Sequence, residues 1–396
     1  MNTQTLGPNV VRLPLPHSDQ LRVMVVAESF LPQINGVTNS VRRVLEHLDN
    51  ENHIARLLAP TGPETYSGFP VVKVRGAQLP FIKDFRVGLE TQRRLRSAMM
   101  RFAPDVVHIA SPASLGYQAL HAARDLEIPT VAIYQTDLVG FADRYGIPGA
   151  PGAMARLTRR IHKDADLTLA PSSASIKQLN DLGIYNVARW GRGVDLELFS
   201  PTKASESLRQ QLAPNGEKLV GYIGRLAPEK ELELLGHLEG MPGVRLVVVG
   251  EGPEEARLRK LLPTAAFLGL LHGEELATAY ATLDVFVHTG RHETFCQAAQ
   301  EALASGVPVV APRSGGPIDV VDDGAGFLYT AGVAEEMTEY VRSLVEQPML
   351  RQRMALQARR SVSNRSWAGV NGLLVDYYRE VIAEKSGAAS LDERVG

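Results

Sequence analysis

Two glutamates, Glu293 and Glu301, stand eight residues apart where an apolar strand pattern gives way to a helical one. On an α-helix this spacing is about 2.2 turns and roughly 12 Å of rise, so both carboxylates would project to broadly the same side. Such a pair can accept hydrogen bonds from two separated hydroxyl-bearing groups of one ligand, as a nucleotide sugar has. In isolation, a helix-dipole contact and a solvated side chain explain the pair better. Its surroundings must therefore decide.

Two cations, Arg225 and Lys230, follow the strand predicted over residues 219–223. Arginine offers a planar fork and lysine a point charge, and both suit phosphate oxygens. A diphosphate leaving group gains negative charge as its bond to a sugar breaks, and two cations can stabilise that charge without a metal. Either residue alone reads as a surface cation. Together at a strand end they predict a diphosphate site.

Glycines and charged residues occupy four consecutive strand ends in the second half of the chain. Gly250 and Gly252 form a tight turn beside which a flat base could lie, and His288, Glu293 and Gly315 follow two later strands. Ligands of open parallel sheets bind at the carboxyl ends of the strands. The clustering therefore predicts one ligand site at this edge.

Strand and helix patterns alternate along most of the chain, which predicts an α/β fold with doubly wound parallel sheets. Candidate strands span residues 21–27, 53–58, 71–74, 106–110, 130–134, 167–170 and 187–190, then 219–223, 245–249, 266–269, 284–288, 307–311 and 326–329. The helical patterns span residues 37–48, 86–102, 114–126, 151–163, 173–182, 333–346, 349–362 and 367–386.

A Gly-, Pro- and Ser-rich connection divides the two strand series, and two such arrays in tandem face each other most naturally across a cleft. The expected parts are a flexible N-terminus (1–20), a first domain (21–195), a linker (196–215), a second domain (216–365), a crossover helix (366–386) and a flexible tail (387–396). The last helices are expected to fold back along both domains.

The composition indicates a cytoplasmic protein. The one cysteine, Cys296, fits a reducing compartment and lies among apolar residues, so we expect it to pack rather than react. The first 20 residues lack the apolar core of a signal peptide, and no run of 18 apolar residues suggests a transmembrane helix. The formal net charge of −2 does not indicate a nucleic-acid partner.

Two stretches, Lys83–Arg101 and Met154–Lys163, are basic and partly amphipathic. Each cation near an anionic lipid surface contributes about 1 kcal/mol to binding, so these stretches predict a peripheral contact with the inner face of the membrane. A solvated basic helix is the commoner explanation of such a pattern.

Three positions in the first half could face the cleft. Asn35-Gly36 precedes the helix at 37–48 and lets backbone N–H groups approach an anion, although an ordinary strand-to-helix turn explains it equally well. His108 and Asp137 lie near strand ends, where a lone His or Asp is more often structural. No G-x-G-x-x-G dinucleotide motif follows the first strand.

The sequence resembles the family-4 retaining glycosyltransferases of GT-B fold over roughly residues 21–370. The motifs that carry the resemblance are AESFLPQINGV, GRLAPEK, GEG, EALASGVPVVAPRSGGP and the two glutamates separated by seven residues. Within the family, AESFLPQINGVTNSV, DVVHIASPASLGY and YQTDLVGFADRYGIP look most like bacterial GDP-mannose-dependent α-mannosyltransferases that act on glycolipids. Sulfolipid-forming glycosyltransferases look like the next nearest kin.

The resemblance implies two Rossmann-like domains across a cleft, retention at the anomeric carbon, and no cofactor or essential metal beside the nucleotide-sugar donor. The implied donor contacts are Arg225 and Lys230 to the diphosphate with Gly36 close by, Glu301 to the ribose, and Glu293 with the backbone N–H groups of Thr294, Phe295 and Cys296 to the hexose. Many relatives place a histidine at an acceptor-side strand end, where this sequence has Tyr134-Gln135-Thr136-Asp137. Asp137 and His108 are the candidates for the acceptor hydroxyl.

The leading hypothesis is transfer of mannose from GDP-mannose to a lipid-linked or polyol acceptor, giving an α-glycoside in glycolipid and phospholipid metabolism. A UDP-sugar-dependent transferase of glucosyl, N-acetylglucosaminyl or sulfoquinovosyl groups is one alternative, and a GT-B sugar-nucleotide epimerase is another. A non-catalytic nucleotide-sugar-binding module is the third, and the intact set of Arg225, Lys230, Glu293 and Glu301 disfavours it.

Overall fold

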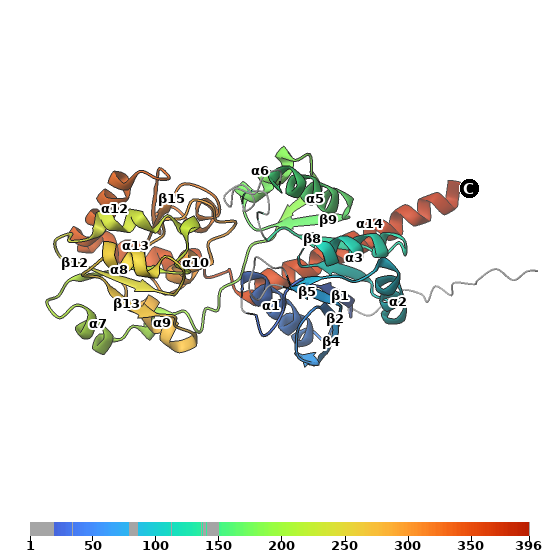
Figure 1. Cartoon of the computed structure of the whole chain (residues 1–396), viewed down its shortest axis with the longest axis horizontal. Helices are drawn as coiled ribbons and strands as arrows, with labels where there is room; N and C mark the ends of the chain where they lie inside the picture. Colours follow the sequence, from blue (N-terminus) through green and yellow to red (C-terminus); the bar gives the residue numbers. More distant parts are fainter. Residues whose placement is uncertain are drawn as a thin grey trace, which may run out of the picture.

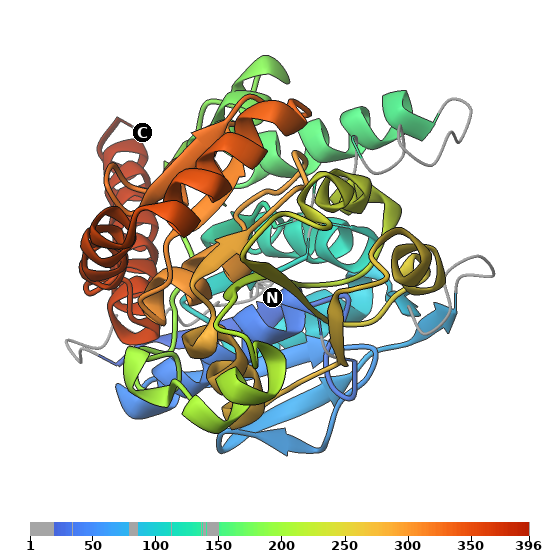
Figure 2. The same ribbon diagram turned by 90° about the vertical axis from the view of Figure 1, so that its left-hand side faces the viewer.

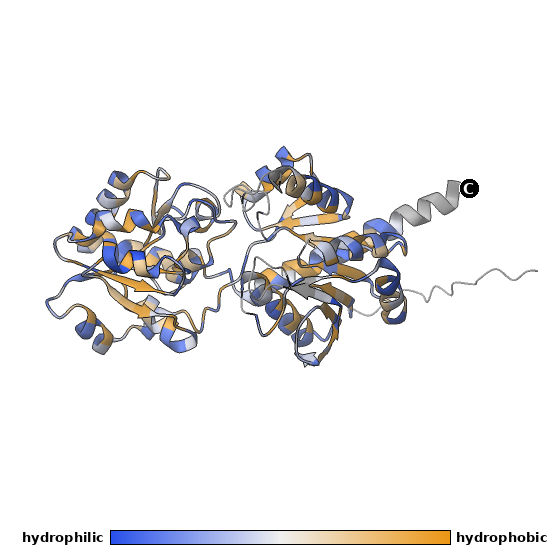
Figure 3. Ribbon diagram, viewed as in Figure 1, coloured by the Kyte–Doolittle hydropathy of each residue, from blue (hydrophilic) through white to orange (hydrophobic). Residues whose placement is uncertain are grey.

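The computed structural model describes residues 20–33, 35–78, 86–111, 113–135, 137, 140 and 150–395. The chain forms two α/β domains that follow one another along the long axis of the molecule (Figures 1 and 2). In both, hydrophobic strands lie between helices whose outer faces are hydrophilic (Figure 3). This is the layering expected of parallel sheets covered on both faces.

The first domain is built on an eight-stranded sheet with the order β10-β9-β8-β7-β1-β2-β4-β3. Neighbouring strands pair in parallel, except β3 with β4. The strands are β1 (Arg22–Val26), β2 (Ile54–Ala59), β3 (Thr65–Tyr66), β4 (Phe69–Lys73), β7 (Val106–Ile109), β8 (Thr130–Ile133), β9 (Leu167–Ala170) and β10 (Val187–Arg189). The strand order reverses at β1, and a crevice forms at such a switch point.

Helices cover both faces of this sheet because the side chains of its strands alternate. Val23 and Val25 of β1 pack in one core cluster with α1 and α14, whereas Met24 and Val26 pack in another with α2, α3 and α5. These helices, with α6, are α1 (Gly36–Asn50), α2 (Gln92–Phe102), α3 (Ser114–Arg124), α5 (Ala150–Asp164), α6 (Ser173–Asp181) and α14 (Trp367–Val395).

The second domain has a six-stranded parallel sheet with the order β13-β12-β11-β14-β15-β16, so its switch point lies between β11 and β14. The strands are β11 (Lys218–Ile223), β12 (Val244–Val249), β13 (Ala266–Gly269), β14 (Val285–Val287), β15 (Val309–Pro312) and β16 (Gly326–Tyr329). The helices are η1 (Pro201–Lys203), α7 (Glu206–Leu212), η2 (Pro228–Lys230), η3 (Leu232–Leu238), α8 (Glu255–Leu261), α9 (Gly273–Thr282), α10 (Gln297–Ala304), α11 (Pro317–Val320), α12 (Ala334–Glu346) and α13 (Pro348–Ser361).

Helix α14 returns from the second domain and packs on the first, which is the course expected of a crossover helix. Its Tyr378 is buried in the first domain's core, and Val370 accepts a hydrogen bond from Trp190 Nε1 at 2.9 Å. The helix continues to Val395. Residues 387–395 are therefore helical, where a flexible tail was expected.

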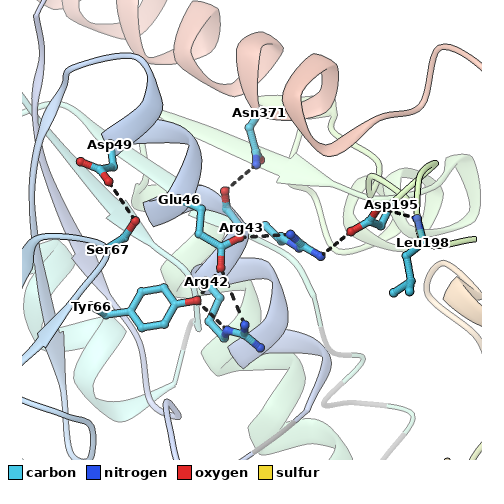
Figure 4. Close-up of polar contacts among 9 residues, drawn as sticks. All are labelled: Arg42, Arg43, Glu46, Asp49, Tyr66, Ser67, Asp195, Leu198 and Asn371. Carbon is cyan, nitrogen blue, oxygen red and sulfur yellow. Dashed lines mark hydrogen bonds and ion pairs between the residues drawn. The ribbon is translucent and has the colours of Figure 1, made fainter. Parts of the chain in front are cut away.

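A polar network ties α14 to the connection between the domains (Figure 4). Arg43 of α1 pairs with Glu46 and with Asp195, each at 3.2 Å. Asn371 of α14 donates to the Arg43 carbonyl at 2.9 Å, and Asp195 accepts from Leu198 N–H at 3.0 Å. Helix α1 thus contacts both the connection between the domains, through Asp195, and α14, through Asn371.

Each of the thirteen predicted strands is present, with bounds shifted by at most two residues. The helix predicted over 86–102 was wrong at its start, because Arg86–Gly88 forms strand β6 against β5 (Gly76–Gln78). Helix α2 instead begins after Thr91, whose side chain accepts from Arg94 N–H. The first residues of the basic stretch Lys83–Arg101 lie outside the described residues. The expected flexible N-terminus also lies almost wholly outside them. Among the described helices, none is long and apolar enough to cross a bilayer.

Candidate active site

A cavity of about 670 Å³ lies between the two domains. The carboxyl ends of β1, β7 and β8 face it from the first domain, and those of β11 and β14 from the second. Seven of the predicted site residues line it, namely Gly36, Arg225, Lys230, Glu293, Thr294, Phe295 and Cys296. The two switch points thus form one site.

Lys230, Glu293 and His288 form the charged centre of this cavity. Lys230 Nζ donates to Glu293 Oε1 in an ion pair. His288 Nε2 lies 3.4 Å from the same oxygen. The lysine and the glutamate are 63 residues apart in sequence but are in contact where β11 and β14 end.

Burial and pairing act in opposite directions on these groups. Burial raises the pKa of Glu293, but the hydrogen bond from His288 and the charge on Lys230 outweigh it and hold this pKa far below the usual range. Burial likewise lowers the pKa of His288, yet Cys296 and Glu293 more than offset it and raise it to about 10. Glu293 is therefore a carboxylate at neutral pH, able to accept hydrogen bonds from hydroxyl groups.

Glu293 is not on the helix, so the spacing of 2.2 turns does not apply. Helix α10 begins at Gln297, and Cys296 before it has a left-handed backbone with φ 79°. The loop is held by the next strand's turn, since Gly316 N–H donates to the Glu293 carbonyl at 2.8 Å. A Cβ on Gly316 would lie 2.1 Å from the Phe295 carbonyl oxygen, so only glycine permits this contact. Cys296 packs in the core, as predicted.

Glu301 lies within α10 and does not line the cavity. Burial raises the pKa of its carboxyl to about 7, against hydrogen bonds from Gln297 and Tyr280. The ribose contact therefore stays a prediction.

The segment with Arg225 and Lys230 depends on the glycines of the following strand end. A Cβ on Gly250 would lie 2.0 Å from the Gly224 carbonyl oxygen, and one on Gly252 would lie 2.2 Å from that of Leu226. Neither glycine lines the cavity. These close contacts let the two turns pack together, and the expectation that the glycines flank a base stays a prediction.

The first domain contributes the start of α1. Asn35 caps this helix by accepting from Thr38 N–H at 2.9 Å, and its amide donates to Ser29 Oγ at 2.7 Å. The first turn holds no acidic residue, so its partial positive charge is not neutralised. Gly36 lines the cavity there, in keeping with a place close to the diphosphate.

The sequence predicted that His108 faces the acceptor side of the cleft, and this prediction was wrong. It lies on β7 with only 1% of its surface exposed, and Nδ1 is 2.6 Å from the Tyr378 hydroxyl of α14. Burial lowers its pKa to about 3. Since it does not line the cavity, the structure gives it a role in packing α14 on the sheet.

Asp137 lies in a second, smaller hollow of about 220 Å³ that shares Glu293 and Thr294 with the main cavity. Its Oδ1 accepts from Gly140 N–H at 2.8 Å. It thus lies beside Glu293 and Thr294 but outside the main cavity.

The sequence reasoning missed Glu28, Gln135 and Arg192, which also line the cavity. Glu28 Oε1 accepts from Leu115 N–H at 2.5 Å, and its Oε2 accepts from Gly88 N–H at 2.8 Å. Burial raises its pKa to about 7 despite these bonds. Its position directly after a buried strand was the available signal.

Comparison with known proteins agrees with this architecture. Residues 34–198 match the Glycosyltransferase Family 4 domain, and residues 204–361 match the Glycosyl transferases group 1 domain. The chain is 48% identical over 379 residues to a GDP-mannose-dependent alpha-mannosyltransferase of Mycobacterium tuberculosis, covering 93% of this chain and 99% of that protein. A protein of the same name from Mycolicibacterium smegmatis is 45% identical, covering 92% and 99%.

The fold has the same arrangement in a solved structure of sucrose-phosphate synthase from Thermosynechococcus elongatus. The TM-score is 0.76 at 18% identity, covering 92% of this chain and 100% of that one. Two Rossmann-like domains with a cavity between them form the GT-B fold of glycosyltransferases. The chain belongs to family 4 of these enzymes.

Proposed function

We propose that this enzyme transfers mannose from GDP-mannose to a lipid-linked acceptor, with retention and an α-glycosidic product. The observation that carries the proposal is the pairing of Lys230 with Glu293 in the interdomain cavity. It sets a phosphate-binding cation beside a carboxylate for hexose hydroxyls. The identity of nearly half the residues with GDP-mannose-dependent relatives over almost the whole chain supports guanine and mannose.

The site residues have distinct parts in this reaction. Arg225 and Lys230 hold the donor diphosphate, with Gly36 at the start of α1 close to it, and Glu293 accepts hydrogen bonds from the mannose hydroxyls. As the bond from C1 to the β-phosphate oxygen breaks, the cations stabilise the negative charge that develops on GDP. The acceptor oxygen forms its bond to C1 on the same face, and its proton passes to the leaving phosphate. No metal ion or cofactor enters this sequence.

The lipid nature of the acceptor is supported by the exposed cations of α5. Arg156, Arg159, Arg160 and Lys163 are exposed on this helix. Each can add about 1 kcal/mol of attraction to an anionic bilayer. We propose that this face docks the enzyme on the cytoplasmic side of the membrane. Flotation with vesicles containing anionic lipid, against vesicles of neutral lipid, would test it.

A donor panel tests the whole proposal. GDP-mannose, UDP-glucose, UDP-N-acetylglucosamine and UDP-sulfoquinovose would be supplied with membrane lipid extract, and mass spectrometry would identify the products. Mannolipid formed from GDP-mannose, lost in Lys230→Ala, is expected. Glycolipid formed only from a UDP-sugar would overturn the donor. Donor turnover without transferred sugar would favour an epimerase instead.

A further inference from the structure

Arg192 lies in the connection that follows β10 and lines the interdomain cavity. Its Nη1 donates to the Gly36 carbonyl at 3.0 Å, and its Nη2 donates to Gln135 Oε1 at 2.9 Å. Its own carbonyl accepts from Gln300 Nε2 of α10 at 2.8 Å. Both domains therefore hold this residue in place.

The guanidinium keeps bonding capacity toward the cavity. A guanidinium has five N–H donors, and these two hydrogen bonds use one on each terminal nitrogen. Within the part of the chain that the structure describes, no carboxylate lies within ion-pair distance of it. Burial lowers its pKa to about 10, against the charge of Glu293, so it remains a cation at neutral pH. The positive charge of Arg192 beside the cavity therefore favours an anionic ligand there.

The place of Arg192 indicates which part of the donor it meets. It contacts Gly36 at the N-terminus of α1, where the helix favours anions. It also lies close enough to Glu293 for that carboxylate to affect its pKa. Since Glu293 is proposed to hold the hexose and Gly36 to lie by the diphosphate, Arg192 stands where the two meet.

The charges around it point the same way. Glu293 already pairs with Lys230, and Arg225 lies 3.9 Å from Glu229. Arg192 is the cation of this set without a carboxylate partner among the described residues. A diphosphate brings the negative charge that would balance it.

We propose that Arg192 binds the β-phosphate of the donor from the first domain's side, as a third cation beside Arg225 and Lys230. The inference rests on the proposed function in that the donor carries a diphosphate. It makes Arg192 a catalytic residue, because the β-phosphate is the group that takes up charge when the sugar leaves. It also links donor binding to domain position, since the anchors of Arg192 lie in both domains.

The test compares ligands with and without the β-phosphate. Calorimetry would give the affinities of GDP and GMP for the wild type, Arg192→Gln and Arg192→Lys. Lys203→Gln is the matched control, since Lys203 of η1 lies in the same connection but outside the cavity and pairs with Glu274. Loss of a charged hydrogen bond predicts a roughly 10–100-fold weaker GDP affinity in Arg192→Gln. GMP affinity should change less than about twofold, and the control should match the wild type.

Each outcome bears on one claim. Equal losses for GDP and GMP would mean that Arg192 only fastens Gly36 and Gln135, and would overturn the inference. If thermal melting shows that Arg192→Gln is unfolded, Arg192→Lys takes its place in the test. A loss of GDP affinity without a matching loss of GMP affinity would support the inference, and equal changes for the two nucleotides would contradict it. A wild type that binds GMP as tightly as GDP would instead sink the proposed diphosphate site itself.

Discussion

Removal of the Lys230 ammonium is the perturbation with the largest expected effect on catalysis. Lys230→Ala takes away a cation that contacts the leaving diphosphate, and such a loss costs about 2–4 kcal/mol of transition-state stabilisation. It also leaves the Glu293 carboxylate facing the phosphates without the ammonium, with His288 at 3.4 Å as the partner that remains. The two effects add, so the expected loss is at the upper end, roughly 10²–10³-fold in kcat/KM.

Arg225 provides the contrast within the same segment. Its side chain is 65% exposed and sits 3.9 Å from Glu229. Solvent screens such a charge, so Arg225→Ala should cost about 2 kcal/mol, or roughly 30-fold in kcat/KM. The order of the two variants follows from burial.

Steady-state kinetics with GDP-mannose measure both variants, and Lys218→Ala is the control. Lys218 starts β11, at the end of the strand opposite to Arg225. A double variant refines the test: Lys230→Ala should cost less in a Glu293→Gln background, where no carboxylate faces the phosphates. Lys230→Ala within threefold of the wild type, or strictly additive losses, would refute the reasoning.

The structure makes three more predictions. The Glu28 pKa is raised from 4.5 to about 7, so the folded protein holds this proton longer and stability should fall as pH rises from 4.5 through 7. Glu28→Gln should flatten that part of a melting-temperature profile, and an unchanged slope would contradict the shift. Asp319 of α11 accepts from Ser173 N–H at 2.7 Å and pairs with Arg189 at 3.1 Å across the domains. Asp319→Ala should open the cleft and raise the radius of gyration in small-angle scattering. Identical scattering curves for the variant and the wild type would show that these contacts do not hold the domains together. Removal of divalent metal with EDTA should leave mannosyl transfer unaltered, because cationic side chains supply the charge; loss of activity restored by one metal would disprove this.

The sequence alone determined the layout of the fold and the phosphate side of the site. Runs such as Leu219–Ile223 are too apolar for a surface, and the periodicity that marks them is local. Because parallel strands end at one edge of a sheet, the positions of Arg225, Lys230 and Glu293 along the chain already imply that these side chains meet there. The helix over residues 367–386 was predictable from local periodicity as well.

Tertiary contacts decided the rest. Glu293 leaves the helix because the turn at Gly316, a later part of the chain, packs on its loop. His108 is buried because α14, 270 residues further on, supplies the hydroxyl of Tyr378. Local periodicity cannot report such contacts, which join residues far apart in sequence.

The residues that the first domain contributes to the cavity also depend on tertiary contacts. Arg192 carries no motif in its neighbourhood that marks it as a site residue, and Glu28, within AESFLPQINGV, has only its place after a buried strand as a signal. Glu28 reaches the cavity because the N–H groups of Leu115 and Gly88 hold its carboxylate. Arg192 reaches it because the connection folds between Gly36 and Gln300. The sequence determined which chemistry each side chain can perform, and only the packing of the two domains decided which side chains meet the ligand.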